Sequence, residues 1–456
     1  MKDMKLRNIL LLLALGMLFA CEPKVDDFTT TSGSADFSKY VAIGNSLTAG
    51  YADKELYKAG QEDSYPAILA YQFKAAGGGE FTQPLMFDEY GFGSRLLFDA
   101  AKPGPVPAAV IPDPRNFTSI AANGPFNNMG VPGAKSFHLV PGAESFSALN
   151  PYYARFAAQP GTSTVLEEAA AQNATFFTCW IGNNDVLGYT LAGGATDSIT
   201  NPLIFQMAVG GVLQGMTANG AKGAIANIPD VTAIPFVQYM NTQVPYNGLV
   251  MNAEQAAGLN FAYDQFELYL ASLGITWDYG FEFVEGANAF VVSDEEVPLP
   301  PPFNVRQMVL GELFLLTLPT DSLPMGMGSV DPSGDQIVPW GIPNQYVLLS
   351  SELSEISQAT TAYNGIIETL AGQFDLALVD MNEKFATIAN EGVEIDGILF
   401  TSDFITGNSF SLDGVHMTTQ GYSVAANYFI EAINAKYNSG IRTVSPRLYP
   451  GIYYYQ

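Results

Sequence analysis

Apolar and polar positions along the chain form blocks that predict strands followed by helices. The run from Tyr40 to Gly44 is apolar throughout and leads into Gly-Asn-Ser-Leu at 44–47, which predicts a buried strand that ends in a sharp turn. The run from Phe176 to Ile181 is apolar except at Thr178, as is typical of a strand covered on both faces. Further strands are predicted at 224–230 and 376–381, and the aromatic residues 453–455 predict a packed final strand.

Helical spacing of apolar residues separates these strands. A helix is predicted to begin at Ser64-Tyr65-Pro66, where Ser64 can cap and proline is tolerated in the first turn, and to end before Gly77. Other helices are predicted at 164–171, 202–216, 351–373 and 419–437. The alternation predicts an α/β protein of three layers, α/β/α, with a central parallel sheet.

Two segments break this alternation. Residues 81–127 are rich in Pro, Gly, Asn and Phe without a clear period, which predicts long loops near the active edge of the sheet. Residues 242–344 are too long for a structureless loop in a compact domain, so they predict a large insertion with elements of its own and a candidate cap over the site. The predicted core therefore comprises 37–241 and 345–456.

The first residues are predicted to be an export signal rather than part of the fold. Basic residues at 2, 5 and 7 precede an apolar run at 9–20, which is shorter than the roughly 20 residues of a membrane span. Leu18-Phe19-Ala20-Cys21 resembles the cleavage box of bacterial lipoproteins, in which Cys21 would carry the lipid. The alternative is an ordinary secretory signal with an incidental cysteine.

A flexible tether is predicted at 21–36, because Thr, Ser, Gly and acidic residues cannot bury a core. Its Lys24-Val-Asp26-Asp27 tract resembles acidic tracts that direct lipoproteins of Bacteroidota to the cell surface. These features predict an outer-membrane lipoprotein held by an N-terminal lipid, facing the periplasm or the exterior.

Composition excludes some partners. The chain has 19 Lys and Arg against 45 Asp and Glu, a formal charge of −26, so it has too few cations to neutralise the phosphates of nucleic acid or an anionic membrane surface. The second cysteine, Cys179, lies in an apolar run and is predicted to be a buried strand residue. If Cys21 is acylated, no disulfide can form.

The candidate chemistry centres on one serine and one histidine. Ser46 follows a predicted strand, where open α/β sheets place their active sites. Of only two histidines, His416 lies three residues after Asp413, a spacing that can bring a carboxylate onto one imidazole nitrogen while the other faces outward. A satisfied loop pair is the alternative for this weak motif. His138 has no acid close in sequence and is predicted to be structural.

Four blocks in order resemble the GDSL or SGNH hydrolase superfamily: Gly-Asn-Ser-Leu at 44–47, Gly133, Gly-Asn-Asn-Asp at 182–185 and Asp-x-x-His at 413–416. The resemblance covers both ends of the mature chain but not the insertion, and it implies a flavodoxin-like sheet. The roles it implies are Ser46 as nucleophile and backbone oxyanion donor, Gly133 as a second backbone donor, Asn184 as a side-chain donor, His416 as base and Asp413 as its orienting acid.

Two positions depart from the family pattern, and competing motifs are absent. Asn45 stands where the family usually has Asp, which keeps hydrogen-bonding capacity but removes a charge, and Lys135 replaces a small polar residue and is predicted to be a solvated loop residue. No Gly-x-Ser-x-Gly elbow and no His-Glu-x-x-His motif occurs in the sequence.

The expected activity is hydrolysis of carboxylic esters, of lipase or esterase type, through an acyl-enzyme and without metal or cofactor. The expected substrate is a small-molecule, lipid or glycan ester. Two alternatives stay open: an O-acetyl esterase or acyltransferase acting on carbohydrate with the same fold, and a catalytically inert surface-binding lipoprotein. The apolar composition of 242–344 favours acyl chains over acetyl groups.

Overall fold

The computed structural model describes residues 29–456 except 100, 103, 334–336, 453 and 456. The predicted export signal and Cys21 lie outside the described residues, as do residues 21–28 of the predicted tether. The rest of that tether is attached to the body, because the Ser34 N–H donates to the Tyr437 carbonyl at 2.8 Å and Ala35 is buried.

A five-stranded parallel sheet lies at the centre of the molecule. Its strands are β1 (Tyr40–Gly44), β4 (Asn128–Gly130), β5 (Phe176–Trp180), β6 (Lys222–Ala226) and β15 (Ala377–Val379), in the spatial order β15-β6-β5-β1-β4. Every neighbouring pair is parallel. Counted among themselves, these strands have the flavodoxin-like order 2-1-3-4-5, in which ligands bind beyond the carboxyl ends of the first and third strands. The predicted α/β class and parallel sheet are confirmed.

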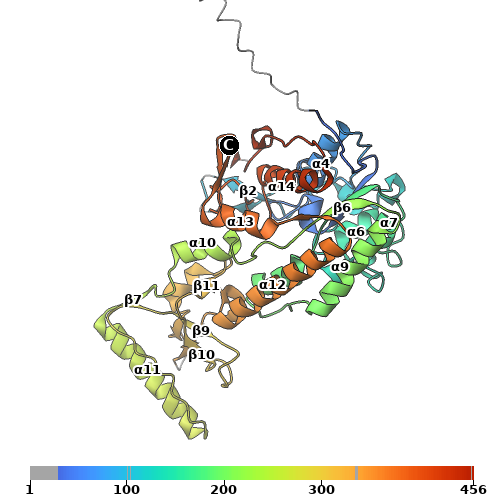
Figure 1. Cartoon of the computed structure of the whole chain (residues 1–456). Coiled ribbons are helices and arrows are strands. Elements are labelled where there is room, and N and C mark those ends of the chain that lie inside the picture. Colours follow the sequence, from blue (N-terminus) through green and yellow to red (C-terminus); the bar gives the residue numbers. More distant parts are fainter. Residues whose placement is uncertain (1–28, 100, 103, 334–336, 453, 456) are drawn as a thin grey trace, which may run out of the picture.

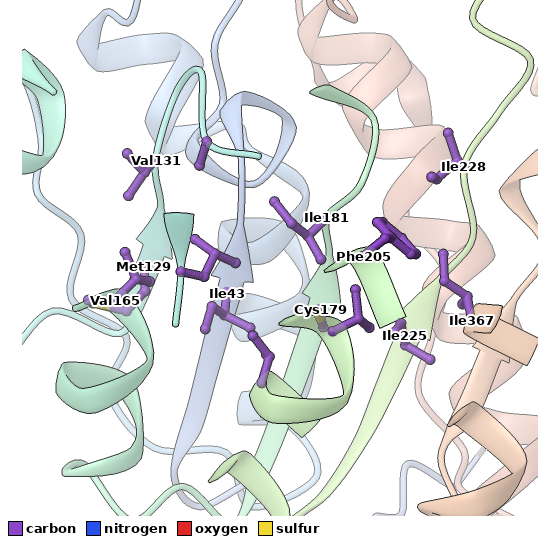
Figure 2. Close-up of a cluster of buried hydrophobic side chains, with 14 of the residues drawn as sticks. Ile43, Met129, Val131, Val165, Cys179, Ile181, Phe205, Ile225, Ile228 and Ile367 are labelled. Atoms are coloured by element: carbon purple, nitrogen blue, oxygen red, sulfur yellow. The ribbon is translucent and has the colours of Figure 1, made fainter. Parts of the chain in front are cut away.

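Side chains of each central strand alternate between two apolar layers, because successive strand residues point to opposite faces. Ile43 and Cys179 point into a layer that also contains Phe205 and Ile367 (Figure 2). Trp180 joins the other layer. The first layer is covered by α7 (Val165–Ala170), α9 (Pro202–Thr217) and α12 (Ser350–Gln373), and the second by α4 (Tyr65–Lys74), α13 (Met381–Asn390) and α14 (Thr419–Tyr437) (Figure 1).

The helices that cover the sheet begin at recognisable caps. Thr164 and Glu167 form a reciprocal capping box at α7, and Asn201 accepts from the Leu203 N–H at the start of α9. Ser64 precedes α4 as predicted, but its side chain makes no capping bond and its hydroxyl lies 3.4 Å from the Gln83 Oε1. Shorter helices are α2 (Ser46–Ala49), α3 (Lys58–Glu62), α5 (Phe146–Leu149), α6 (Pro151–Phe156), α8 (Asn184–Leu191) and α10 (Pro235–Gln243), with 3-10 turns η4 (Ser136–His138), η6 (Asn344–Tyr346) and η7 (Pro446–Leu448).

Two central strands are shorter than their apolar runs predict, because polar residues tie their ends together. β6 ends before Asn227, whose side chain donates to Asp380 at 2.8 Å and accepts from the Asn382 N–H at 2.9 Å. β15 ends before Asp380, which caps α13 by accepting from the Glu383 N–H at 3.1 Å. The predicted strands at 224–230 and 376–381 were therefore right in position and wrong at their carboxyl ends.

The predicted loops at 81–127 contain short elements that tie the C-terminus to the body. Strand β2 (Leu96–Asp99) pairs antiparallel with β3 (Val106–Pro107) and parallel with β18 (Tyr454–Tyr455). The predicted final strand is therefore present at 454–455. Two 3-10 turns, η2 (Pro114–Phe117) and η3 (Ala121–Asn123), complete this segment.

The described residues of 242–344 form small sheets and one long helix, α11 (Ala253–Ser272), which projects away from the α/β body (Figure 1). This region has two apolar clusters, which include Phe290 and Phe314 in one and Tyr263 and Phe283 in the other. Its short elements are β7 (Leu249–Met251), β8 (Gly286–Asn288), β9 (Val291–Ser293), β10 (Val305–Gln307), β11 (Leu313–Phe314), η5 (Thr320–Met325), β12 (Ser329–Asp331) and β13 (Val338–Trp340), with β14 (Val347–Leu348) following η6.

The segment before α14 contains a small hairpin of β16 (Val393–Ile395) and β17 (Ile398–Phe400), which lies outside the central sheet. The loop that carries Asp413 and His416 therefore follows a hairpin strand and not a strand of the central sheet. Within the described part of the chain, no helix is long and apolar enough to cross a membrane.

Candidate active site

Ser46 is the first residue of α2, and only Asn45 separates it from the end of β1. Asn45 caps this short helix, because its Oδ1 accepts from the Leu47 N–H at 3.0 Å, and its Nδ2 lies 3.4 Å from the Asn183 Oδ1 in the loop after β5. Asn45 thus shapes the turn that carries Ser46 and links it to the neighbouring loop. Gly44 is required at the end of β1, since a Cβ there would lie 2.4 Å from the backbone carbonyl of Trp180 on the neighbouring strand.

His416 joins Ser46 to Asp413 in an unbroken chain of contacts. The Nε2 atom of His416 lies 2.9 Å from the Ser46 Oγ, and the Nδ1 atom lies 2.9 Å from the Asp413 Oδ2. The other carboxylate oxygen, Oδ1, accepts from the backbone N–H groups of Val415 and His416 at 2.9 and 2.8 Å. The structure therefore brings together the three residues that the sequence singled out.

The environment of Asp413 keeps its carboxylate ionised. Burial raises the pKa of Asp413, but the facing imidazole of His416 and the hydrogen bonds from His416 and Val415 outweigh it and lower this pKa to about 2. The carboxylate is thus charged throughout the neutral range and can hold the imidazole in the tautomer with hydrogen on Nδ1.

Tyr51, which the sequence analysis did not single out, packs against the imidazole. Its ring centroid lies 4.6 Å from that of His416, and its hydroxyl donates to the Lys54 carbonyl at 2.5 Å. Burial raises the pKa of Tyr51, so its hydroxyl stays neutral. In the sequence, this contact is indicated only by the short separation of Tyr51 from Ser46, which is five residues.

Gly133 and Asn184 lie at the carboxyl ends of β4 and β5, on either side of the loop that carries Ser46. All three line one pocket. Gly133 has φ +79°, and a Cβ placed on it would lie 3.9 Å from its nearest protein neighbour, so backbone conformation rather than crowding by the protein requires glycine here. The Asn184 side-chain nitrogen donates to the Ala134 carbonyl at 2.9 Å, which orients the amide and leaves its second hydrogen for a ligand.

Asp185 braces the loops that carry these two residues. Its carboxylate accepts from the Ser136 N–H at 2.8 Å and from the Ser136 hydroxyl at 2.7 Å. Burial raises the pKa of Asp185, while the bonds from Ser136 oppose that shift. The last residue of Gly-Asn-Asn-Asp therefore fixes the loop after β4 against the start of α8.

The structure differs from the prediction for Lys135 and places His138 away from Ser46 and His416. Lys135 was predicted to be solvated, but its side chain is only 15% exposed and forms an ion pair with Asp197 at 2.7 Å. Its ammonium group also donates to the Ser198 carbonyl at 3.1 Å, so the segment at 197–198 covers it. His138 lies outside the site: its Nδ1 accepts from the Lys135 N–H at 3.1 Å, and its ring stacks on Phe146 at 4.2 Å. Burial is the main cause that lowers the pKa of His138, and the positive charge of Lys135 lowers it further.

Two pockets meet at Ser46 and His416. The first, here called the apolar pocket, extends from Ser46 to α13 and is lined mainly by hydrocarbon and aromatic side chains, including Leu47, Trp180, Ile234, Phe385, Ala389 and Phe410. The second, here called the mixed pocket, is more open and includes Tyr51, Lys54, Gly133, Tyr152, Leu316 and Thr317. Leu316 and Thr317 are the contribution of residues 242–344 to the described lining of these two pockets.

Within the described ranges, no group of three or more His, Cys, Asp or Glu side chains is arranged to hold a metal ion. Cys179 is buried in β5 as predicted, and burial raises the pKa of its thiol to about 12.

No family model matches the chain, and no curated protein matches it. Solved structures that resemble it include LAE5, an alpha/beta hydrolase enzyme from the metagenome of Lake Arreo, Spain, with 11% identity, a TM-score of 0.34, and coverage of 88% of this chain and 97% of that chain. A putative GDSL-like lipase from Parabacteroides merdae ATCC 43184 has 10% identity, a TM-score of 0.33, and coverage of 89% and 99%.

Proposed function

We propose that this protein is a serine hydrolase that cleaves carboxylic esters, with Ser46 as its nucleophile. The observation that carries the proposal is the continuous contact from the Ser46 Oγ through both ring nitrogens of His416 to Asp413, each step 2.9 Å long. A nucleophile, a base within hydrogen-bonding reach and a third group that orients the base are the parts that serine catalysis needs.

The proposed reaction has two steps. His416 takes the Ser46 proton on Nε2 as Oγ attacks the ester carbonyl, and it then gives that proton to the departing alcohol, leaving an acyl group on Ser46. Water activated by the same nitrogen adds to the acyl-enzyme, and the acid departs as Oγ regains a proton. Asp413 remains ionised and stabilises the imidazolium formed in each step.

The oxyanion that forms during both steps needs donors fixed in advance. The backbone N–H groups of Ser46 and Gly133 and the free amide hydrogen of Asn184 are the proposed donors. Their support lies in the common pocket that they line and in the bond from Asn184 to Ala134, which fixes the amide before a substrate binds. Removing one such donor in a serine hydrolase costs roughly 2.7–4 kcal/mol of transition-state stabilisation.

The two pockets support an ester with an acyl chain longer than acetyl. Hydrocarbon side chains dominate the lining of both pockets, and the pockets differ mainly in size, about 60 Å³ for the apolar pocket and about 560 Å³ for the mixed pocket. The smaller apolar pocket is proposed to take a short acyl chain, and the larger and more open mixed pocket the alcohol portion. Burial of a methylene group contributes roughly 0.8 kcal/mol, so a pocket of this chemistry discriminates by chain length.

Labelling with a fluorophosphonate probe tests the proposed nucleophile directly. The purified protein is expected to react at Ser46, identified by mass spectrometry of the labelled peptide, and Ser46→Ala is expected not to react. Absence of labelling in folded protein would support an inert binding scaffold. A nitrophenyl ester series from acetate to decanoate then tests the substrate class, and activity confined to acetate would favour the carbohydrate O-acetyl esterase.

We also propose that the protein is exported and anchored to the outer membrane through a lipid on Cys21, on the basis of the sequence at 18–21. Metabolic labelling with a fatty-acid analogue is expected to mark the wild-type chain and not Cys21→Ser. Labelling that persists in that variant would exclude Cys21 as the anchor.

A further inference from the structure

The loop that follows the nucleophile helix contains a two-residue turn in an unusual conformation. Ala52 and Glu55 exchange two backbone hydrogen bonds, of 3.1 and 3.0 Å, so that Asp53 and Lys54 are the central residues of a tight hairpin turn. Both have positive φ, +54° and +67°. Turns of this kind favour Asn-Gly or Asp-Gly, because most side chains resist the left-handed region. A lysine at the second position is therefore held there against its own preference.

This conformation points two consecutive backbone donors at the loop that carries the acid. The Asp53 N–H donates to the Ser411 Oγ at 2.9 Å, and the Lys54 N–H donates to the Asp413 Oδ2 at 2.9 Å. The Ser411 hydroxyl in turn donates to the Asp413 Oδ1 at 3.1 Å. Each carboxylate oxygen of Asp413 is thus connected to the turn, one directly and one through Ser411.

The hydrogen bond from the Lys54 N–H ends on Oδ2 of Asp413, the oxygen that faces His416. The donors from Val415 and His416 reach Oδ1 and belong to the acid's own loop, so they move with it. The Lys54 N–H reaches Oδ2, which lies 2.9 Å from the His416 Nδ1, and it comes from the segment that follows Ser46. It therefore fixes the acid relative to the nucleophile segment.

The Asp53 side chain secures the other end of the turn. Its Oδ1 accepts from the Leu412 N–H at 3.1 Å, while its Oδ2 accepts from the Tyr57 hydroxyl at 3.1 Å and lies 3.4 Å from the Arg95 Nη2. The Arg95 guanidinium in turn lies over the Tyr57 ring at 3.5 Å. These groups are buried, so the turn has a rigid support that can hold a strained conformation.

We propose that the Asp53–Lys54 turn, acting with Ser411, is a positioning device that sets the Asp413 carboxylate on His416. The inference rests on the proposed function insofar as Asp413 is the orienting acid. Ser411, Asp53 and the backbone of Lys54 touch neither substrate nor the Ser46 Oγ in this scheme; they are positioning groups that act through Asp413.

Ser411→Ala tests the device, with Ser409→Ala as the matched control. Ser409 lies in the same loop and is 2% exposed against 1% for Ser411, but its hydroxyl faces the Gly407 carbonyl and not Asp413. We expect Ser411→Ala to lower kcat about tenfold with KM unchanged, and Ser409→Ala to change neither by more than twofold. Thermal unfolding of both variants separates lost activity from lost folding.

A spectroscopic measurement tests the same point without relying on turnover. A hydrogen on the His416 Nδ1 that faces a carboxylate gives a low-field proton resonance. The only other histidine, His138, accepts a hydrogen bond at its Nδ1 and cannot give that signal. Ser411→Ala is expected to shift or broaden the resonance, and Ser409→Ala to leave it unchanged.

Equal behaviour of the two variants in both measurements would overturn the proposal. If Ser411→Ala fails to fold, Ser411→Cys fills nearly the same space with a weaker donor and is expected to change the resonance in the same direction. Failure of the proposed function would look different, because wild-type protein would then lack fluorophosphonate labelling at Ser46 whatever the state of the His416 resonance.

Discussion

The Nε2 atom of His416 lies 2.9 Å from the Oγ atom of Ser46, although 370 positions separate the two residues in the chain. One residue follows β1 and the other precedes α14, so the contact exists only when the first and last parts of the fold are assembled. Ser46→Ala and His416→Ala are each expected to lower kcat by about 10⁴- to 10⁶-fold, since the nucleophile and the base act as a unit.

Steady-state kinetics with a nitrophenyl ester checks this prediction, and the double variant provides its control. Because the two residues act together in the proposed reaction, removing both is expected to lower kcat little more than removing either one. Near-wild-type hydrolysis by pure Ser46→Ala protein, free of contaminating esterase, would contradict the proposed role of Ser46.

The architecture and the identity of the candidate site could be predicted because they depend on local signals. Apolar runs such as 176–181 report burial on both faces of a strand, and Ser46, Gly133, Asn184, Asp413 and His416 each lie in a short motif. What could not be predicted depends on contacts between distant segments. β6 and β15 are cut short by the side-chain bond between Asn227 and Asp380, 153 residues apart, and no periodicity of either strand records it.

The support of the site was missed for the same reason. Ser411 lies two residues before Asp413, but its role depends on the turn at Asp53, 358 positions away. Lys135 was expected in solvent because a loop lysine usually is, and only the approach of Asp197 buries it. The projecting helix α11 belongs to a region whose length predicted elements of its own without indicating their arrangement (Figure 1).

Asn184→Ala is expected to lower kcat about 10²- to 10³-fold while KM changes little, because the oxyanion to which the amide is proposed to donate exists only in the transition state. Kinetics on a single ester gives both constants. Asn219→Ala is a suitable control, since this exposed asparagine donates only to the Asn173 side chain among the described contacts. A large rise in KM with unchanged kcat would place Asn184 in substrate binding instead.

Ala389→Trp is expected to shorten the preferred acyl chain. Ala389 lines the apolar pocket from α13, so an indole there would occupy space that the chain needs. The pocket has a volume of about 60 Å³, which suits a short chain. Two methylene groups are worth roughly 1.6 kcal/mol at about 0.8 kcal/mol each, so hexanoate hydrolysis should fall about 15-fold relative to butyrate. Relative kcat/KM values across the nitrophenyl ester series measure this change in chain-length preference.

The control for this change is Ala386→Trp, one turn earlier on α13 and outside the described pocket lining. It should leave the chain-length profile unchanged. If Ala389→Trp also leaves the profile unchanged, the acyl chain does not enter the apolar pocket.

Asp413 makes the stability of the fold depend on pH in the acid range. Its pKa is depressed from 3.8 to about 2 in the folded state, so its contribution is present above the unfolded value and is lost as pH falls through the folded one. The shift corresponds to about 2 kcal/mol. Asp413→Asn should therefore be less stable than wild type at pH 6, and the difference should narrow between pH 4 and pH 2. Denaturant unfolding over this range measures it, and a constant difference would exclude the linkage.

Lys54→Gly is expected to stabilise the protein, although it removes a side chain. Lys54 has φ +67°, a conformation that costs a non-glycine residue about 1–2 kcal/mol, whereas glycine adopts it freely. Part of the gain is lost because glycine is more flexible when unfolded, so the free energy of unfolding should rise by about 0.5–1 kcal/mol. Lys384→Gly, in the interior of the helix α13, should lower it instead, since lysine is the better helix former. Both differences are measurable by denaturant unfolding, and a loss of stability in Lys54→Gly would mean that the lysine side chain contributes more to the turn than its backbone strain costs.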